Sequence, residues 1–386
     1  MADPRISRLE TISFSYEKAN LGTDYHGFNT VYEEGAVQTA GGSILLVHTD
    51  AGVTGCSPFL STLDAAVLPR VWPFLKGRNA LEREFIYDEI KRAQRQQARI
   101  GVAAIDVALW DLAGRLFEQP IYRLLGGWKQ SVPCYASTYH GDENGGLDSP
   151  EAYAEFAVRC REMGYPAFKI HGWGNAPVQR EVNNVLAVRR AVGDEMDLML
   201  DPACELRTFG DAVKVGHACD DARFYWYEDP FRDGGISQFA HRKLRQLIRT
   251  PLLQTEHVRS LEPHIDFVLA DATDFVRGDI ASDGITGAMK LAHAAEALGI
   301  DIEFHGPGPE KRQCMAAIRN TNYYELGLVH PKAPASHVHG LFVDYSDDLD
   351  AIDGRGHVPI PNGPGLGVDI DWDWLKAHET GRRVLE

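Results

Sequence analysis

The hydrophobic pattern predicts a small mixed domain at the start of the chain. The β-rich segments ISRLETISFSYE and SILLVHTDAGVTG, flanked by glycine, indicate strands. Residues 60–127 change to a helical period that ends at Gly126 and Gly127. In GVAAIDVALWDLAGRLF, one helical face carries Val102, Ile105, Leu109, Leu112 and Leu116. Strands followed by segregated helices predict an α+β domain over residues 1–130.

From about residue 131, short apolar runs alternate with amphipathic stretches such as SPEAYAEFAVRCREMG. The strand candidates are VPCYAST, AFKIHG, DLMLDP, FYWYEDP, PLLQTEH, FVRGDIA, DIEFHGP and YYELGLV. Eight strands with helices between them fit a (β/α)8-type barrel over residues 131–340. The remaining segment, 341–386, has no barrel period, and we expect it to pack back on the first domain.

Composition is compatible with this two-domain plan. A chain of 386 residues is too long for one ordinary core, and its 44% apolar and 24% charged residues are typical of a globular enzyme. It has no run of 18 or more apolar residues, and its charged N-terminus lacks a signal segment, so we expect a cytoplasmic protein that does not bind membranes. Six cysteines without a CxxC pair indicate reduced thiols.

The net charge of −16 argues against a nucleic-acid partner, because phosphates require clustered Lys and Arg. It does not exclude an anionic small molecule, since a bound metal and a few local cations can reverse the field inside a site. P-loop, GxGxxG, GxSxG and HExxH motifs are missing, so phosphoryl transfer, dinucleotide redox chemistry, serine hydrolysis and zinc proteolysis have no support.

Polar residues recur where the predicted strands end. In chain order they are Lys169, His171, Asp201, Glu228, Glu256, Asp279, His305 and, within the eighth strand, Glu325. From Lys169 to Asp201 and onward, the spacing is about one βα unit. All these groups are therefore expected at the C-terminal mouth of the barrel, where such enzymes place their chemistry.

Three successive acids at that mouth predict a metal site. Asp201, Glu228 and Glu256 would repel one another without a neutralising ion, and oxygen ligands at this charge density suit Mg²⁺. Any one of them alone could be a helix N-cap or a salt-bridge partner. Three in consecutive units favour the metal.

The ordered motifs resemble the enolase superfamily, specifically its mandelate racemase subgroup. KIH, DPA, YEDPF, TEH, RGDIASDGITGAMKLA and FHGP follow in that order, after GVAAIDVALWDLAGRLFEQPIYRLLGG and before PNGPGLGVDID. The resemblance covers essentially the whole chain. It implies an α+β capping domain on a (β/α)7β barrel, with Asp201, Glu228 and Glu256 as the Mg²⁺ ligands.

The residues and the resemblance agree on one chemistry, removal of the proton next to a substrate carboxylate. His305 is the candidate base, and Asp279, one strand earlier, could fix its tautomer and raise its basicity. A packed core histidine is the alternative. Glu325 would stabilise the enediolate, as its counterpart does in the family, and would need to be protonated by burial. A plain salt bridge is its alternative.

On the opposite face, the family pattern Lys-x-Lys is replaced by Lys169-Ile170-His171. Strand alternation puts Lys169 and His171 on one face, where Lys169 would neutralise the substrate carboxylate. His171 is either an acid/base or a hydrogen-bond donor. Because the His305–Asp279 dyad is the one clear base and the role of His171 is open, dehydration of a sugar acid is favoured over racemisation or epimerisation. A lapsed barrel that only binds a ligand is the third alternative.

Substrate selection is expected in two capping-domain loops, 16–30 and 50–57. The first offers Tyr16, Asp24, Tyr25 and His26 as candidate hydroxyl-binding groups, although ordinary loop polarity explains them equally well. We interpret Cys204, His257 and the pair His337 and His339 as packing or supporting groups. A homo-oligomer acting on a small carboxylate is expected.

Overall fold

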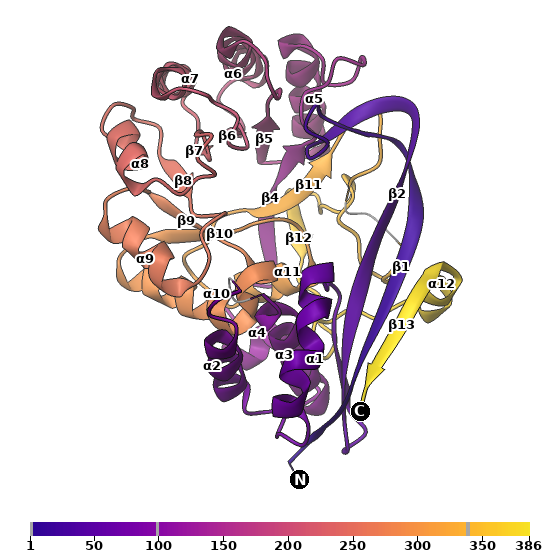
Figure 1. The fold of residues 1–386 in the computed structure, drawn as a ribbon. Coiled ribbons are helices and arrows are strands. Elements are labelled where there is room, and N and C mark those ends of the chain that lie inside the picture. The colour runs from indigo at the N-terminus through magenta and orange to yellow at the C-terminus, as the bar shows by residue number, and fades with distance from the viewer. Residues whose placement is uncertain (1–2, 98–99, 337–339) are drawn as a thin grey trace.

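The computed structural model describes residues 3–97, 100–336 and 340–386, so the pair His337 and His339 lies outside the described residues. Its first unit is an antiparallel sheet with helices against it (Figure 1). The strands, in the order of the sheet, are β13 (Glu379–Leu385), β1 (Ile6–Thr23), β2 (Thr30–Thr49) and β3 (Thr54–Ser57). The helices are α1 (Thr62–Leu75), α2 (Arg83–Ala93), α3 (Val102–Leu116) and α4 (Ile121–Leu124).

Helix α3 joins the two cores of the molecule. Four residues of its predicted apolar face, Val102, Ile105, Leu109 and Leu112, are buried in the cluster shared with α1, α2 and the antiparallel sheet. Val107, which lies on another side of the helix, is buried in the barrel cluster. Because α3 is apolar around most of its circumference, it can bury both sides, as a helix between two layers does.

The second unit is a curled parallel sheet, as predicted. Its strands are β4 (Ser131–Thr138), β5 (Ala167–His171), β6 (Asp197–Asp201), β7 (Trp226–Glu228), β8 (Leu252–Gln254), β9 (Phe275–Gly278), β10 (Asp301–Phe304) and β11 (Tyr324–Val329). Hydrogen bonding runs without interruption from β10 through β4 to β11. Contacts between β10 and β11 bring the two ends of this path together, which gives the sheet its barrel-like curvature.

Helices cover the outer face of this sheet (Figure 1). They are α5 (Pro150–Met163), α6 (Val178–Val192), α7 (Phe209–Asp221), α8 (Gln238–Arg245), α9 (Leu261–Leu269), α10 (Ile280–Ala297) and α11 (Pro309–Met315). Their boundaries follow local chemistry. Helix α5 begins at the N-cap Ser149, whose side chain accepts the Ala152 amide, and ends at Gly164 in a left-handed conformation.

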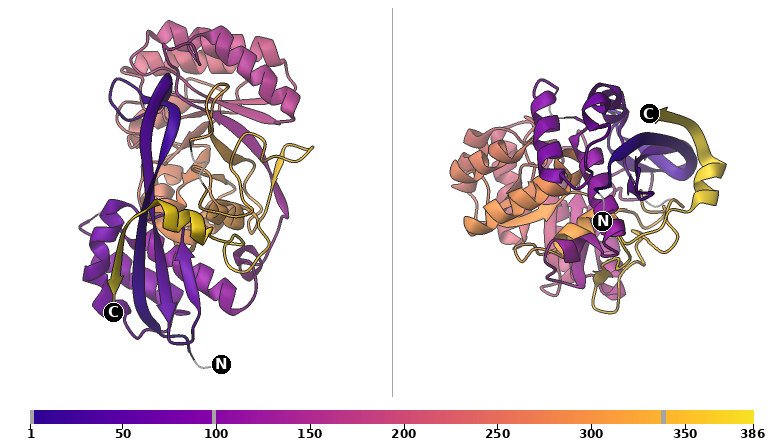
Figure 2. Two further views of the ribbon diagram at one scale, coloured as in Figure 1. Left: turned by 90° about the vertical axis from the view of Figure 1, so that its right-hand side faces the viewer. Right: turned by 90° about the horizontal axis from the view of Figure 1, so that it is seen from below.

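The last part of the chain contacts both units. β12 (His357–Pro359) pairs antiparallel with β4 of the barrel, whereas β13 pairs with β1 of the first sheet. Between them, α12 (Trp372–His378) lies against β1 (Figure 2). The two sheets are therefore held together by the chain terminus as well as by α3.

The predicted loop 16–30 is mostly strand. β1 and β2 form one long ribbon in which β1 pairs with β2 as far as Thr23, so only residues 24–29 form the loop at its tip. Likewise, residues 54–57 are β3, and the connection from β2 covers residues 50–53. The sequence pattern missed this because the ribbon is supported by backbone pairing and has no sustained alternation of buried and exposed residues. Among the described residues, no helix is long and apolar enough to cross a membrane.

Candidate active site

The three predicted metal ligands converge at the C-terminal mouth of the barrel. Asp201 is the last residue of β6, Glu228 the last of β7, and Glu256 follows β8 by two residues. One carboxylate oxygen from each lies within 4.8 Å of the others. This is an all-oxygen donor set of the kind that hard divalent cations take.

Two acids of this trio, Glu228 and Asp201, have pKa values shifted in opposite directions. Burial raises the pKa of Glu228 to about 8, with Asp201 and Glu256 adding to the effect of burial while Arg277 and Lys169 oppose it. Burial also works against ionisation of Asp201, but Lys169 and His171 outweigh it and hold its pKa well below the usual range. A divalent cation would favour the ionised form of Glu228 against burial and the neighbouring acids, so the residues present fit such an ion.

Lys169 lies at the centre of these carboxylates. Its Nζ is 3.0 Å from Glu228 Oε2, 3.4 Å from Asp201 Oδ2 and 2.8 Å from Glu325 Oε1, and the side chain is 1% exposed. Burial disfavours the ammonium, but Glu228 and Glu325 raise its pKa well above the usual value. Lys169 is therefore a fixed positive charge in a water-poor site, suited to holding an anion.

His171 also points into the mouth, on the same side as Asp201. Its Nδ1 donates to the carbonyl oxygen of Thr138 at 2.8 Å, and its Nε2 is 3.1 Å from Asp201 Oδ2. The ring packs against His140, with centroids 4.7 Å apart. Because the Thr138 carbonyl can only accept, it fixes the proton on Nδ1 and leaves Nε2 as the nitrogen able to exchange a proton.

His305 follows β10 and lies at the other end of the acid trio. Its Nε2 is 3.5 Å from Glu256 Oε1, and 44% of the side chain is exposed. Asp279 instead caps helix α10, accepting the Ala281 amide at 2.9 Å. Within the described ranges, no hydrogen bond or ion pair joins His305 to Asp279. The proposed pairing of these two residues stays a prediction.

Glu325 is tied to two cations, which changes the role expected for it. Burial raises its pKa, but Arg277 and Lys169 more than offset this and hold the pKa well below the usual range. Arg277 Nη2 donates to Glu325 Oε2 at 2.5 Å and the Ser137 hydroxyl donates to Oε1 at 2.9 Å. Two buried cations contact the carboxylate, so they oppose the protonation by burial that a donor role for Glu325 would require, and that role stays a prediction.

Arg277 is the functional-site residue that sequence reasoning missed. It lies on β9 two residues before Asp279, is fully buried, and its Nε is 2.9 Å from Glu228 Oε1. Its Nη1 also donates to the Tyr135 hydroxyl at 3.1 Å. An arginine within an otherwise apolar barrel strand was the available signal, because a charge there needs partners.

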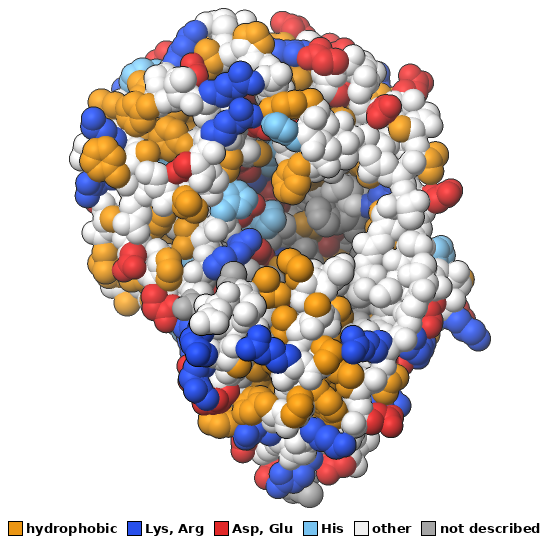
Figure 3. Space-filling model, viewed as in Figure 1, with side chains coloured by type: hydrophobic (Ala, Val, Ile, Leu, Met, Phe, Trp, Pro, Cys, Tyr) orange, Lys and Arg blue, Asp and Glu red, His pale blue; other side chains and the backbone are white. Residues whose placement is uncertain are grey.

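The tip of the β1–β2 ribbon reaches the barrel loops. Tyr25 Oη lies 3.5 Å from Glu205 Oε2 and accepts from Arg232 Nη2 at 2.7 Å, while His26 Nε2 is 3.4 Å from the same Arg232 nitrogen. Asp24 accepts backbone amides of its own loop, including that of Phe28 at 3.1 Å. In the space-filling view, a hollow separates the barrel from the ribbon, with histidine side chains at its edge (Figure 3).

Tyr16 lies elsewhere. Its ring packs against Phe14 and Trp374, with centroids 6.3 and 5.8 Å away, in the cluster between β1 and α12. Its position within a strand, rather than in the predicted loop, explains this packing. These contacts do not support the substrate-binding role predicted for Tyr16.

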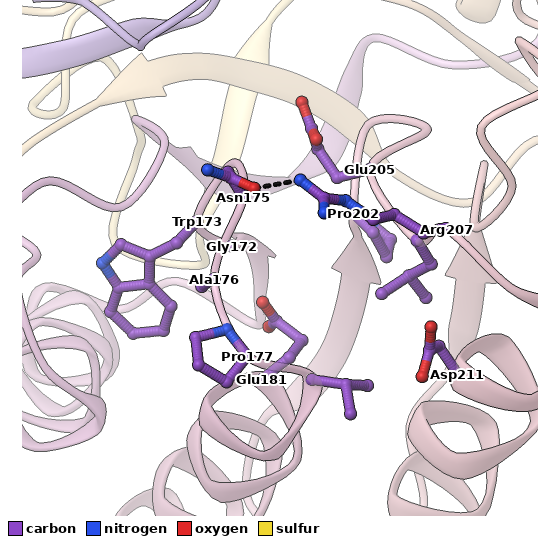
Figure 4. Close-up of a pocket in the computed structure, with 12 residues that line it drawn as sticks. Gly172, Trp173, Asn175, Ala176, Pro177, Glu181, Pro202, Glu205, Arg207 and Asp211 are labelled. Atoms are coloured by element: carbon purple, nitrogen blue, oxygen red, sulfur yellow. Dashed lines mark hydrogen bonds between the residues drawn. The ribbon is translucent and has the colours of Figure 1, made fainter.

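A small cavity of about 110 Å³ lies between the loops that follow β5 and β6 (Figure 4). Gly172 and Pro202, which directly follow His171 and Asp201, line it together with Glu205 and Arg207. Arg207 donates to Asn175 across its rim. Because the chemistry-bearing side chains of the mouth lie outside this lining, we assign it to loop packing rather than to the reaction.

Comparisons with known proteins agree with this geometry. The family described as "Mandelate racemase / muconate lactonizing enzyme, N-terminal domain" matches residues 29–126, and "Enolase C-terminal domain-like" matches residues 152–374. The magnesium complex of D-glucarate dehydratase from Agrobacterium tumefaciens superposes with a TM-score of 0.90 at 30% identity, covering 98% of this chain and 100% of that one.

Two curated relatives extend the comparison. A D-xylonate dehydratase from Haloferax volcanii is 26% identical, covering 89% of this chain and 86% of the relative. A D-galactarolactone cycloisomerase from Agrobacterium fabrum is 29% identical, covering 91% and 95%. The relatives thus include more than one reaction type on one fold.

Proposed function

The chain belongs to the enolase superfamily, in its mandelate racemase and muconate lactonizing branch, and on that premise we propose that it is a magnesium-dependent dehydratase of a hydroxylated carboxylate such as a sugar acid. The carrying observation is the acid trio at the barrel mouth with one imidazole at each end, His171 beside Asp201 and His305 beside Glu256. The relatives named as dehydratases of xylonate and glucarate support this reaction class.

Asp201, Glu228 and Glu256 would hold the ion. Bound Mg²⁺ polarises a substrate carboxylate and makes the neighbouring C–H more acidic. Lys169 is positioned to bind the same carboxylate, because it is a buried cation among the ligands. Glu325 pairs with Lys169 and is itself held by Arg277, which fixes the position of the lysine.

His305 would act as the base. Its partly exposed imidazole can meet the α-carbon of a substrate held at the trio and take the α-proton. The electron pair left on the α-carbon expels the hydroxyl from the β-carbon, and His305 returns its proton to that leaving oxygen as water forms. The resulting enol tautomerises to a 2-keto-3-deoxy acid. Atoms balance as substrate minus one water.

Epimerisation is the second candidate, and the placement of His171 favours it. Its Nδ1 is held by Thr138, so Nε2, which lies beside Asp201 whereas His305 lies beside Glu256, would serve as a second acid/base. In that case one imidazole removes the α-proton and the other delivers a proton to the opposite face. A binding protein without turnover would use the same trio and show neither reaction.

The test is a panel of sugar acids and other hydroxy acids incubated in D₂O with metal-stripped protein, with and without Mg²⁺. We expect Mg²⁺-dependent formation of a keto acid from at least one member. Deuterium at the α-carbon of recovered, inverted substrate without keto acid would establish epimerisation instead. Binding with neither exchange nor product would refute the enzymatic proposal.

A further inference from the structure

A second cluster of potential ligands lies beside the acid trio. Cys204, Asp229 and His257 follow β6, β7 and β8, and one potential ligand atom from each lies within 4.8 Å of the others. Asp229 directly follows Glu228, and His257 directly follows Glu256. The same three strands therefore present two adjacent donor sets, one made only of oxygens and one made of sulfur, nitrogen and oxygen.

Asp229 is the residue that most needs a partner in this cluster. It is 1% exposed, and neither carboxylate oxygen accepts a hydrogen bond from the described part of the chain. Its nearest potentially cationic neighbour is His257, with Nε2 at 3.4 Å from Oδ2. Burying a carboxylate without hydrogen bonds is costly, so a cation at this position would satisfy it.

The backbone holds the cluster in place. The Cys204 amide donates to the carbonyl oxygen of Asp229 at 2.7 Å, which ties the two loops together. Gly235 has a φ of +72°, and a Cβ there would lie 2.6 Å from Asp229 Oδ1, so a larger residue would be strained and would displace the carboxylate. His257 has 41% of its side chain exposed, and this gives an ion a route from solvent.

From these observations we propose that Cys204, Asp229 and His257 form a second metal site, for a transition-metal ion of the Zn²⁺ class. Thiolate, imidazole and carboxylate are the ligands that Zn²⁺ takes, whereas Mg²⁺ prefers oxygen alone. Three protein ligands leave the fourth tetrahedral position open to water or to a substrate oxygen. The ion would bind as Cys204 loses its thiol proton to solvent.

The test uses Co²⁺ as a spectroscopic probe of the Zn²⁺ class in full-length protein saturated with Mg²⁺. Thiolate coordination gives a sulfur-to-cobalt charge-transfer absorption in the near ultraviolet, which the all-oxygen trio cannot give. We expect this absorption to saturate at one Co²⁺ per chain and to vanish in Cys204→Ser. His257→Asn should weaken binding by more than the ~10–100-fold typical of losing only a ligand's hydrogen-bond partner.

His217→Asn is the matched control. His217 is an exposed histidine of α7, with Nδ1 3.6 Å from Asp220 Oδ2, and its replacement should leave Co²⁺ binding unchanged. An absent charge-transfer band in the wild-type protein, or a band that persists in Cys204→Ser, would overturn the proposal. If Cys204→Ser does not fold, unchanged Co²⁺ affinity in His257→Asn would overturn it equally. The readout is metal binding rather than turnover, so it is independent of the dehydratase proposal.

Discussion

The barrel mouth and the tip of the β1–β2 ribbon differ in how firmly their polar side chains are held. Lys169 is 1% exposed and contacts three carboxylates, whereas Tyr25 is 51% exposed and its hydroxyl contacts the barrel residues Glu205 and Arg232. Groups that perform chemistry benefit from fixed positions, because misplacement is costly. Substitution of groups that contact the far end of a substrate should reduce the catalytic rate less. We therefore expect reaction and selectivity to reside in separate parts of the molecule.

The largest effect is expected at the acid trio. Asp201→Asn, Glu228→Gln or Glu256→Gln should each abolish turnover, because each removes a ligand from the proposed magnesium site. EDTA should have the same effect on the unmodified protein, and added Mg²⁺ should reverse it. Activity is followed as keto-acid formation, and circular dichroism checks that the variants fold.

Asp194→Asn is the control for these substitutions. Asp194 is an exposed acid paired with Arg223, and it precedes β6, whereas Asp201 is the last residue of that strand, so its replacement should leave turnover unchanged. Full turnover in metal-free protein would contradict the assignment of the reaction to the barrel mouth, since the acid trio would then have no chemical role.

The next largest effect concerns the two imidazoles. His305→Asn should reduce α-proton exchange by roughly 10²–10⁴-fold, the usual cost of losing a general base. Asp279→Asn should cost less, because it acts at most through His305. In a dehydratase, His171→Asn mainly weakens binding, whereas in an epimerase it stops exchange from one stereoisomer. Deuterium incorporation measured by NMR for both epimers distinguishes these outcomes. Exchange that survives His305→Asn but disappears with His171→Asn would reverse the assignment of the base.

The barrel mouth could be predicted from sequence because strand-end chemistry recurs with the βα repeat. Asp201, Glu228 and Glu256 were found in this way, and the structure places their carboxylates together. The eight strands followed from short apolar runs between helical stretches. The spacing of residues could not predict which cations neutralise the buried acids. The ion pair of buried Arg277 with Glu325 depends on which side chains meet across the barrel.

The ribbon could not be predicted in the same way. Residues 16–23 extend β1 by pairing with β2, and this pairing depends on backbone hydrogen bonds between segments distant in sequence. Tyr16 was therefore placed in a loop, although it packs against Trp374 near the chain terminus. Contacts of Tyr25 with Glu205 and Arg232, about 180 to 207 residues away, were likewise invisible to local patterns.

A pH effect of intermediate size is expected at the trio. Burial raises the pKa of Glu228 from 4.5 to about 8, so the metal-free protein holds a proton there at neutral pH. Mg²⁺ must displace that proton, and its affinity should rise about tenfold per pH unit below pH 8 and level off above it. The raised pKa also means that the contribution of Glu228 to folding, present below pH 4.5, is lost as the pH rises towards 8.

Isothermal titration calorimetry in buffers with different ionisation enthalpies measures both the affinity and the proton released. Tyr25→Phe at the ribbon tip is the control, because it should not alter the pH dependence of Mg²⁺ binding. An affinity that is constant between pH 6 and pH 8, without proton release, would show that Glu228 is already ionised and that the cations around it dominate over burial.

The smallest effect is expected at the ribbon tip. Tyr25→Phe removes a hydroxyl that accepts from Arg232, and Arg232→Met removes the donor. We expect these groups to contact the distal hydroxyls of the substrate, and one such hydrogen bond contributes about 0.5–1.5 kcal/mol, so KM for a sugar acid should rise roughly 2–13-fold. The rate of α-proton exchange at saturating substrate should stay near that of the unmodified protein, because a contact to the distal end of the substrate stabilises ground state and transition state alike. Tyr16→Phe is the matched control, since Tyr16 packs against Phe14 and Trp374 and should not affect KM. Loss of exchange in Tyr25→Phe with normal substrate binding would place the ribbon within the catalytic machinery and remove the distinction between the two regions.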